Sequence, residues 1–396
     1  MIRKQLGEII NLKRGYDLPA RMRKKGVYPV ISSSGISGYH SEFKVEGEGL
    51  VTGRYGTLGE VYYVDGKYWP HNTALYVTDF KGNYPKYVYF LLKQLGNLKT
   101  ADKSTVPGVN RNDMHTIMVP YIEPNLQKPI ADCLFQIEKK IELIKRTNAT
   151  LEATSQTLYD YWFVQFDFPD AKGKPYRASD GELVDWHKPS YTIPKGWSVG
   201  NILSIAELYG GGTPPKSNDT YWGGEMPFFT PADSGEDIYC TATEDYITPS
   251  GIKNSSTKLF NVGTIFITAR GSVGKIAIAG KEMGMNQSCY AFAPREGLGS
   301  AFVYFSARQM VDYLKVKSSG SVFNSIVTND IKYTPLVIPP DNLIKQYDKI
   351  VAPLFVSILK NTQEIRRLSE LHDWLLPMFI NGQIKASEDR LVSLQA

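Results

Sequence analysis

The sequence has few cysteines and no long apolar run, and both scarcities restrict the classes of protein that it encodes. Its 396 residues include three cysteines, Cys133, Cys240 and Cys289, without CxxC spacing. This pattern predicts neither a disulfide framework nor a zinc site, and an odd count favours a reducing compartment. No apolar run approaches the roughly 18 residues of a membrane span, and the first residues lack the apolar core of a signal peptide. We therefore expect a soluble, cytoplasmic protein.

The motifs of common enzymes are also missing. The segment most similar to a phosphate-binding loop, residues 269–276, has Ala269 where the first glycine is required and Ile276 where a hydroxyl would bind magnesium. Residues 338–341 read Ile-Pro-Pro-Asp and lack the leading asparagine and trailing aromatic residue of a DNA methyltransferase motif. The five histidines are dispersed. We predict no catalytic residue, no metal and no cofactor; the alternative is a single-chain DNA methyltransferase or nuclease with unrecognised catalytic motifs.

Composition predicts two folded domains of unequal charge. Apolar residues make up 42% of the chain and charged residues 21%, which is typical of globular proteins, and the length suits two domains. The net charge of +5 is weak evidence for nucleic-acid binding by itself. However, residues 1–124 hold 17 lysines and arginines against 11 acidic residues, whereas residues 191–341 hold 12 against 13. The first part is therefore the better match for phosphates.

The chain contains an internal repeat. Residues 47–61 resemble residues 263–276, residues 72–76 resemble 286–290, and Asn112-Asp113 resembles Asn329-Asp330. Within each copy, β-branched or alternating runs predict strands at 59–64, 264–268 and 275–279, and apolar runs predict short helices at 85–93 and 300–311. The spacing of about 217 residues therefore predicts two copies of one α+β domain.

Each copy is followed by a long helical pattern. Apolar residues recur every three or four positions, which predicts a helix of about 40 residues with one apolar seam, suited to packing against another such helix. The alternative is that each helix covers its own domain. The predicted seam residues are Ile130, Leu134, Ile137, Ile141, Ile144, Leu151 and Leu158, and then Val351, Leu354, Ile358, Ile365, Leu368 and Leu375. Four polar residues, Asn148, Ser155, Asn361 and His372, interrupt the seams and should restrict the register; for His372 we favour hydrogen-bonded packing over metal binding.

Prolines and glycines mark the ends of these segments. Pro124 precedes the first helix and Pro339-Pro340-Asp341 the second, Phe168-Pro169 should end the first, and Pro377 should end or kink the second before Asn381-Gly382. A polar stretch rich in proline and glycine separates the two halves. The expected organisation is a first domain at 1–124, a helix at 125–165, a linker at 166–190, a second domain at 191–341, a helix at 342–383 and a tail at 384–396.

These features together resemble the DNA-specificity subunit of a type I restriction-modification system. The resemblance rests on residues 6–10 and 13–19 in the first copy, and on Gly196-Trp197, residues 211–216 and residues 221–224 in the second, each copy ending in a heptad helix. It implies two target recognition domains, joined by two long antiparallel, coiled-coil-like spacer helices. It further implies a non-catalytic subunit that reads an interrupted, asymmetric double-stranded DNA site and docks two methyltransferase subunits, with restriction subunits in the full complex. A remaining alternative is a coiled-coil adaptor without a nucleic-acid role.

The repeat also suggests which residues read bases. Side chains present in both copies cannot carry a difference between two half-sites, so we assign Arg54 and Arg270, beside the glycine turns, to phosphate contacts, with an exposed turn arginine as the alternative. Base readers should lie in unshared segments, although a solvated loop residue is the alternative for each. The candidates are Arg21, Arg23, Lys24, Lys25, Ser34 and Tyr55 in the first copy, and Lys216, Ser217, Asn218, Asp233, Ser234 and Asn324 in the second.

Overall fold

The chain forms two compact units, each containing one copy of the repeat. The computed structural model describes residues 2–53, 60–101, 111–186, 188–318 and 324–384. The first unit comprises Met1–Glu142 and Arg367–Ala396, and the second comprises Leu143–Arg366, so each of the two long helices contributes to both units. None of the helices in the described ranges is both long and apolar enough to cross a membrane.

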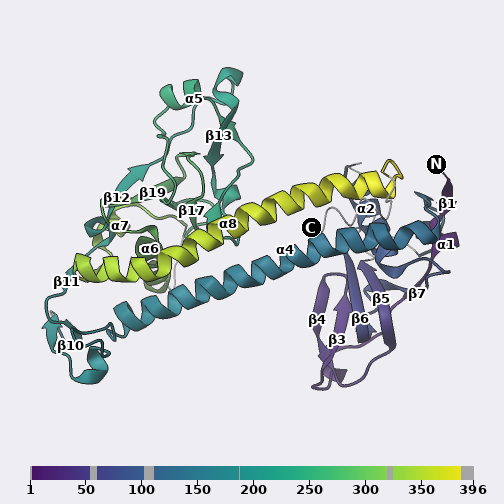
Figure 1. The fold of residues 1–396 in the computed structure, drawn as a ribbon, viewed down its shortest axis with the longest axis horizontal. Helices are drawn as coiled ribbons and strands as arrows, with labels where there is room; N and C mark the ends of the chain where they lie inside the picture. The colour runs from purple at the N-terminus through teal and green to yellow at the C-terminus, as the bar shows by residue number, and fades with distance from the viewer. Residues whose placement is uncertain (1, 54–59, 102–110, 187, 319–323, 385–396) are drawn as a thin grey trace. The chain divides into compact units, whose positions relative to one another are not determined.

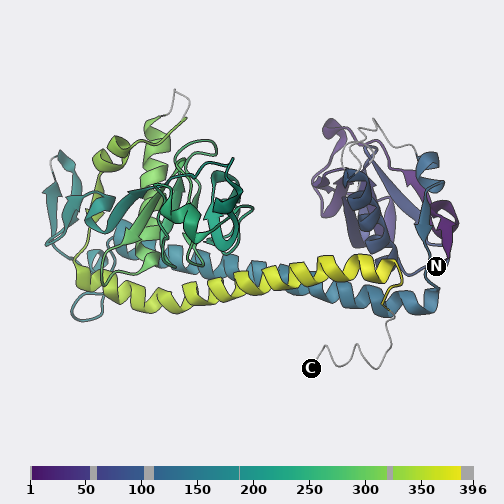
Figure 2. The same cartoon turned by 90° about the horizontal axis from the view of Figure 1, so that it is seen from above.

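The first unit is built around a six-stranded sheet. Its elements are β1 (Arg3–Gln5), α1 (Leu6–Ile9), β2 (Asn11–Arg14), η1 (Ala20–Met22), β3 (Tyr28–Ser32), β4 (Gly35–His40), β5 (Val45–Gly53), β6 (Val61–Pro70), β7 (Ala74–Asp79), α2 (Pro85–Ala101), α3 (Arg111–His115) and β8 (Met118–Pro120). The strand order is β2-β7-β5-β6-β3-β4, so β4 forms one edge (Figure 1). All pairings are antiparallel except that of β3 with β6. Helix α2 packs against β5 and β6 (Figure 2).

The core of the first unit lies between this sheet and its helices. Tyr87 and Phe90 of α2 are fully buried, and Leu50 of β5 lies in the same cluster. Complete burial of one such side chain is worth about 1.5–3 kcal/mol. The predicted strand at 59–64 and helix at 85–93 are confirmed for the described residues, and both elements extend further than predicted.

The second unit has the same plan with a more divided sheet. Its elements are β9 (Leu183–Trp186), β10 (Lys188–Pro194), β11 (Ser198–Gly200), η4 (Ile202–Ser204), β12 (Ala206–Gly210), η5 (Asp219–Tyr221), β13 (Trp222–Phe229), η6 (Pro231–Asp233), β14 (Tyr239–Cys240), β15 (Tyr246–Ile247), α5 (Pro249–Lys253), β16 (Ile265–Thr268), β17 (Ile276–Ala279), β18 (Gly284–Met285), β19 (Cys289–Pro294), α6 (Ser300–Lys317), α7 (Thr328–Tyr333) and β20 (Leu336–Ile338). The larger sheet has the order β12-β19-β16-β17-β14, and β15-β13-β18 form a smaller one. Helix α6 packs on β16, β17 and β19. The strands predicted at 264–268 and 275–279 and the helix predicted at 300–311 are confirmed.

The duplication is visible in the way each unit leads into its long helix. In the first unit, α3 is followed by β8, which pairs antiparallel with β1. In the second, α7 is followed by β20, which pairs antiparallel with β11. The helix α4 (Pro124–Tyr159) follows β8, and α8 (Asp341–Ile380) follows β20. The predicted α+β fold in two copies, each followed by a long helix, is therefore confirmed.

The ends of the long helices lie within three residues of the predicted bounds, but the prolines expected to end them do not do so. Helix α4 begins at Pro124 and continues into a single π-helical turn, η2 (Asp160–Val164), so Phe168-Pro169 does not end it. Phe166 adopts a left-handed φ of 67°, which stops the helix earlier. Pro377 does not end α8, which reaches Ile380 and stops before Asn381-Gly382 as predicted, and a kink at Pro377 stays a prediction. The helix continues because a proline removes only one backbone donor. The chain turns away after the helix at Gly382, where φ is 62°.

The segment predicted as a linker is folded onto the second unit. It contains η3 (Arg177–Ser179), and β9 pairs antiparallel with β10. The Phe168 ring stacks on Tyr176 and on Trp197, at centroid distances of 4.6 and 5.1 Å. Aromatic stacking and burial therefore anchor this segment, which the high content of proline and glycine did not indicate.

Candidate nucleic-acid interface

A short loop in the first unit carries the strongest concentration of positive charge among the predicted base readers. Residues 20–27, which we call the basic loop, include Arg21, Arg23, Lys24 and Lys25 and no acidic residue. Leu18, just before the loop, is only 4% exposed and packs with Val30 and Trp69. The loop is therefore attached directly to the core.

A close backbone contact holds the other end of the loop. An added Cβ on Gly26 would lie 2.3 Å from the carbonyl group of His40, so only glycine fits there. The backbone N–H of Lys24 donates to Nδ1 of His40 at 3.0 Å. His40 is buried and packs edge-on against Trp69. This anchoring fixes the backbone of the loop against the edge strand β4.

The structure separates the four cations into two pairs. Arg23 donates from Nη1 to the carbonyl oxygen of Ser37 at 2.7 Å, and Lys24 lies 3.7 Å from a carboxylate oxygen of Glu42. Arg21 and Lys25 are exposed and have no ion pair with any residue that the structure describes. A cation that contacts a base edge or a phosphate of DNA must be accessible and not already neutralised. Arg21 and Lys25 therefore remain the better DNA-contacting candidates, whereas Arg23 has a structural role.

The remaining candidates of the first unit lie at the turn between β3 and β4. Ser34 is exposed, and its hydroxyl lies 3.2 Å from that of Ser32, which in turn donates to the carbonyl oxygen of Gly35. Ser34 thus supports the turn and still reaches solvent. Arg54 and Tyr55 lie outside the described residues.

In the second unit, two of the three candidates in the loop after β12 already have side-chain partners. Lys216 forms an ion pair with Asp245 at 2.7 Å and lies over the Trp222 ring. The Asn218 side chain accepts a hydrogen bond from the backbone of Thr220 and thereby caps η5. Ser217 is exposed. The side chains of Lys216 and Asn218 therefore stabilise the turn, and base contact stays a proposal for this loop.

Two further candidates of the second unit have clear structural roles. Both carboxylate oxygens of Asp233 accept hydrogen bonds, one from the N–H and hydroxyl of Thr230 and the other from the N–H of Glu244. Ser234 is 2% exposed, and its hydroxyl donates to the carbonyl oxygen of Pro231. These hydrogen bonds give Asp233 and Ser234 structural roles, and base contact by either residue stays a proposal.

Arg270 lies in the glycine turn between β16 and β17. Gly271 and Gly274 both have a φ of 80°, as expected of glycines in a turn. The backbone N–H groups of Ala269 and Arg270 both donate to the carbonyl oxygen of Ser288. The Arg270 side chain is exposed and unpaired within the described ranges, so a phosphate contact stays a proposal. Asn324 is also exposed.

Both long helices bury the face predicted as a seam. Every predicted seam position, from 130 to 162 and from 347 to 379, is buried or half-buried. In the second unit, Nδ2 of Asn361 donates to Oδ1 of Asn148 at 2.8 Å, and the hydroxyl of Tyr347 donates to the carbonyl oxygen of Ser155 at 3.1 Å. Later residues of α4 thus meet earlier residues of α8, which defines antiparallel packing in this unit. Ile358 is 2% exposed in the core there.

A buried ionic cluster joins the helices of the first unit. Nε2 of His372 lies 3.4 Å from Glu138 but is poorly aligned for a hydrogen bond, and Glu138 also pairs with Lys93 at 2.6 Å. Burial lowers the pKa of His372, but the carboxylates of Glu138 and Asp373 outweigh this effect, and the net pKa is raised. Burial likewise raises the pKa of Glu138, yet His372 and Lys93 bring it below its usual range. His372 is therefore a packing residue whose protonated form is favoured by the neighbouring carboxylates.

The described residues do not assemble an obvious reaction centre. No group of three or more histidine, cysteine or acidic side chains within these ranges could hold a metal ion. Burial raises the pKa of Cys240 and Cys289 to about 12, with a further contribution from Asp233, so neither thiol is an activated nucleophile.

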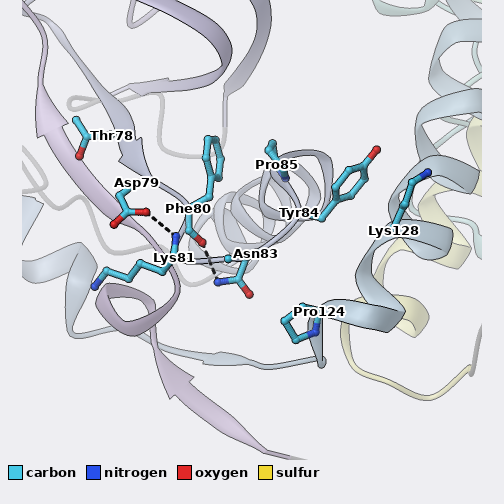
Figure 3. Close-up of a pocket in the computed structure, with 10 residues that line it drawn as sticks. Thr78, Asp79, Phe80, Lys81, Asn83, Tyr84, Pro85, Pro124 and Lys128 are labelled. Atoms are coloured by element: carbon cyan, nitrogen blue, oxygen red, sulfur yellow. Dashed lines mark hydrogen bonds between the residues drawn. The ribbon is translucent and has the colours of Figure 1, made fainter.

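A cavity of about 620 Å³ opens in the first unit between the loop before α2 and the start of α4 (Figure 3). Asp79 in this cavity accepts a hydrogen bond from the backbone N–H of Lys81, and Lys128 pairs with Asp132 at 2.6 Å. Its charged groups are thus already engaged locally, and none of the residues that line it forms a nucleophile–base pair.

Comparison with known proteins identifies the family of this chain. The family model described as type I restriction modification DNA specificity domain matches residues 3–153 and 194–367. The chain belongs to this family. The two matches cover the two copies of the repeat, each with most of its long helix, which agrees with the duplication seen in the structure.

Individual members of the specificity-domain family are similar along most of their length. The specificity subunit of the type I restriction enzyme HindI from Haemophilus influenzae is 25% identical over 331 residues, covering 71% of this chain and 72% of that protein. The MjaIX specificity subunit from Methanocaldococcus jannaschii is 24% identical over 315 residues, covering 76% and 70%. The solved S subunit of a type I restriction-modification system from M. genitalium has a TM-score of 0.62 at 16% identity, covering 95% and 94%. This last likeness supports the fold.

Proposed function

We propose that the protein is the non-catalytic DNA-recognition subunit of a type I restriction-modification complex. In this proposal each unit reads one half of an interrupted, asymmetric site in double-stranded DNA. The helices α4 and α8 act as spacers and, with adjoining surfaces, dock two methyltransferase subunits, to which restriction subunits are added in the full complex.

The observation that carries the proposal is the duplicated specificity domain with different exposed loops in its two copies. The family match occurs twice, at 3–153 and 194–367. The loop after β2 contains four cations, whereas the connection between β12 and β13, residues 211–221, contains one lysine and one aspartate. A shared scaffold with different loops suits the recognition of two different half-sites, because base contacts carry specificity and the scaffold only positions them.

Methylome sequencing tests the proposal directly. The chain is expressed with the methyltransferase encoded beside it, in cells that lack other DNA methylation, and methylated positions are mapped. We expect one interrupted motif with two different halves, and no methylation when the chain or the methyltransferase is expressed alone. Methyl transfer or cleavage by the purified chain alone would instead support the alternative of a single-chain enzyme.

The charge of the first unit gives a second test. Arg21→Gln together with Lys25→Gln should weaken recognition of one half of the motif and leave the other half unchanged. A variant with the same change in charge on another surface, Lys172→Gln with Lys195→Gln, serves as the control, because both of these lysines are exposed. If both pairs of substitutions weaken both halves equally, the basic loop is not the reading surface of the first unit.

A further inference from the structure

The basic loop also exposes two large apolar side chains. Met22 is 59% exposed and Val27 is 77% exposed. We propose that Met22 and Val27 contact thymine C5-methyl groups in the major groove, so that the first unit recognises A·T pairs partly through apolar contact. This inference rests on the proposed function and names the base feature that this loop would read.

Exposed apolar residues are common, and their exposure alone does not indicate a binding site. Here they lie within eight residues that also carry four cations, two of which, Arg21 and Lys25, are exposed and unpaired within the described residues. Positive charge draws the loop to phosphates, while the adjacent apolar groups need an apolar feature on the same partner. In the major groove, the thymine methyl group is the base feature suited to apolar contact.

The loop is held in place before DNA binds. Arg23 is hydrogen-bonded to Ser37, the backbone of Lys24 donates to His40, and Gly26 lies directly against the His40 backbone. These contacts attach the loop to the edge strand β4 at three successive points. Met22 and Val27 are therefore displayed from an ordered backbone, which lowers the entropy lost on binding.

The corresponding loop of the second unit lacks this feature. Strands β2 and β12 are both edge strands, and each pairs with the strand next to the sheet centre, β7 or β19. The connection after β12, residues 211–221, exposes no large aliphatic side chain among its described residues. The two units would read different half-sites, so a contact that only one unit can make would contribute to the difference between the half-sites. Thymine-methyl dependence arising from these residues should therefore be confined to one half of the site.

Uracil substitution tests the inference on the intact complex with its methyltransferase. Each thymine of the mapped motif is replaced in turn by uracil, which lacks only the C5-methyl group, and affinity is measured by fluorescence anisotropy. We expect the wild-type complex to bind about fourfold more weakly to at least one substituted duplex, the factor that corresponds to burial of one methyl-sized group. In the Met22→Ala, Val27→Ala double variant, thymine and uracil at that position should bind equally well.

Met118→Ala is the matched control, because Met118 is 47% exposed on β8 of the same unit and lies outside the basic loop. This variant should retain the fourfold preference for thymine. The inference is overturned if no uracil substitution weakens binding by the wild-type complex. It is also overturned if the double variant still prefers thymine to uracil, whether or not that variant remains bound to the methyltransferase. A wild-type complex that methylates no defined sequence would refute the proposed function and this inference together, whereas a defined sequence without thymine-methyl dependence refutes the inference alone.

Discussion

The two seam asparagines of the second unit form a hydrogen bond with each other, and replacing one of them should destabilise the unit more than replacing the other. Asn361 donates from Nδ2 to Oδ1 of Asn148 at 2.8 Å, and Nδ2 of Asn148 is buried without a partner among the described residues. Asn148 is 8% exposed, whereas Asn361 is half-buried. Asn361→Leu would leave both polar atoms of a buried amide unpaired. We expect this change to destabilise the second unit by about 1–3 kcal/mol, the cost of a newly unsatisfied buried group.

Asn148→Leu should cost less, under about 1 kcal/mol. It removes the buried unpaired Nδ2 and leaves only the amide of Asn361, which can turn to water because the residue is half-buried. The double variant leaves no polar group in the seam at this position, so it should be at least as stable as the wild type. The resulting coupling energy between the two substitutions should be about 1–4 kcal/mol.

Native-state hydrogen exchange of α4 amides within residues 143–155 is the appropriate assay, because a protein of two units need not unfold in one step. Thr150→Leu is the matched control on the exposed side of the same helix and should change stability by less than about 0.5 kcal/mol. Equal losses for Asn148→Leu and Asn361→Leu would refute the effect assigned to the unequal burial of the two amides, and additive losses in the double variant would refute the hydrogen bond between them.

Three further predictions concern the first unit. Arg21→Gln with Lys25→Gln should reduce the slope of log affinity against log salt by about 1.8, since each phosphate contact contributes about 0.9; an unchanged slope would remove both residues from the interface. The pKa of His372 is raised, so its stabilising charge is complete below about pH 6.5 and is lost as the pH rises through the folded-state pKa; the thermal stability of the first unit should therefore fall as the pH rises above about 6.5, and His372→Gln should abolish that fall. Gly26→Ala places a methyl group 2.3 Å from the His40 backbone and should destabilise the unit by about 1–3 kcal/mol, with weaker DNA binding; unchanged unfolding would contradict the close contact.

The duplicated architecture could be predicted from local patterns. The spacing of apolar residues along 130–162 and 347–379 depends only on the period of a helix, and the structure buries or half-buries each of these positions. The glycine turn after β16 was also predictable, because Gly271 and Gly274 adopt a φ that other residues rarely take. Helix ends were less predictable: a left-handed Phe166 and a helix that continues past Pro377 both reflect tertiary packing that overrides local preference.

The choice among candidate DNA-contacting residues required the tertiary structure. The four cations of the basic loop lie within five residues and are chemically alike. However, Arg23 donates a hydrogen bond to the carbonyl oxygen of Ser37 in β4, and of the four only Arg21 and Lys25 are unpaired among the described residues. Composition does not show this difference, because the hydrogen-bond partner is brought close by strand pairing.

The contacts between the two long helices could not be predicted from the sequence either. The repeat makes Asn148 equivalent to Ile365, because the two positions are 217 residues apart. In the folded second unit, however, Asn148 meets Asn361, since the helices pack in opposite directions there. The apolar face of each helix could therefore be predicted from the sequence, because the periodicity that defines it is local to the chain. The residues that meet across that face are known only from the folded chain, because contact depends on the direction and register of packing between segments about 200 residues apart.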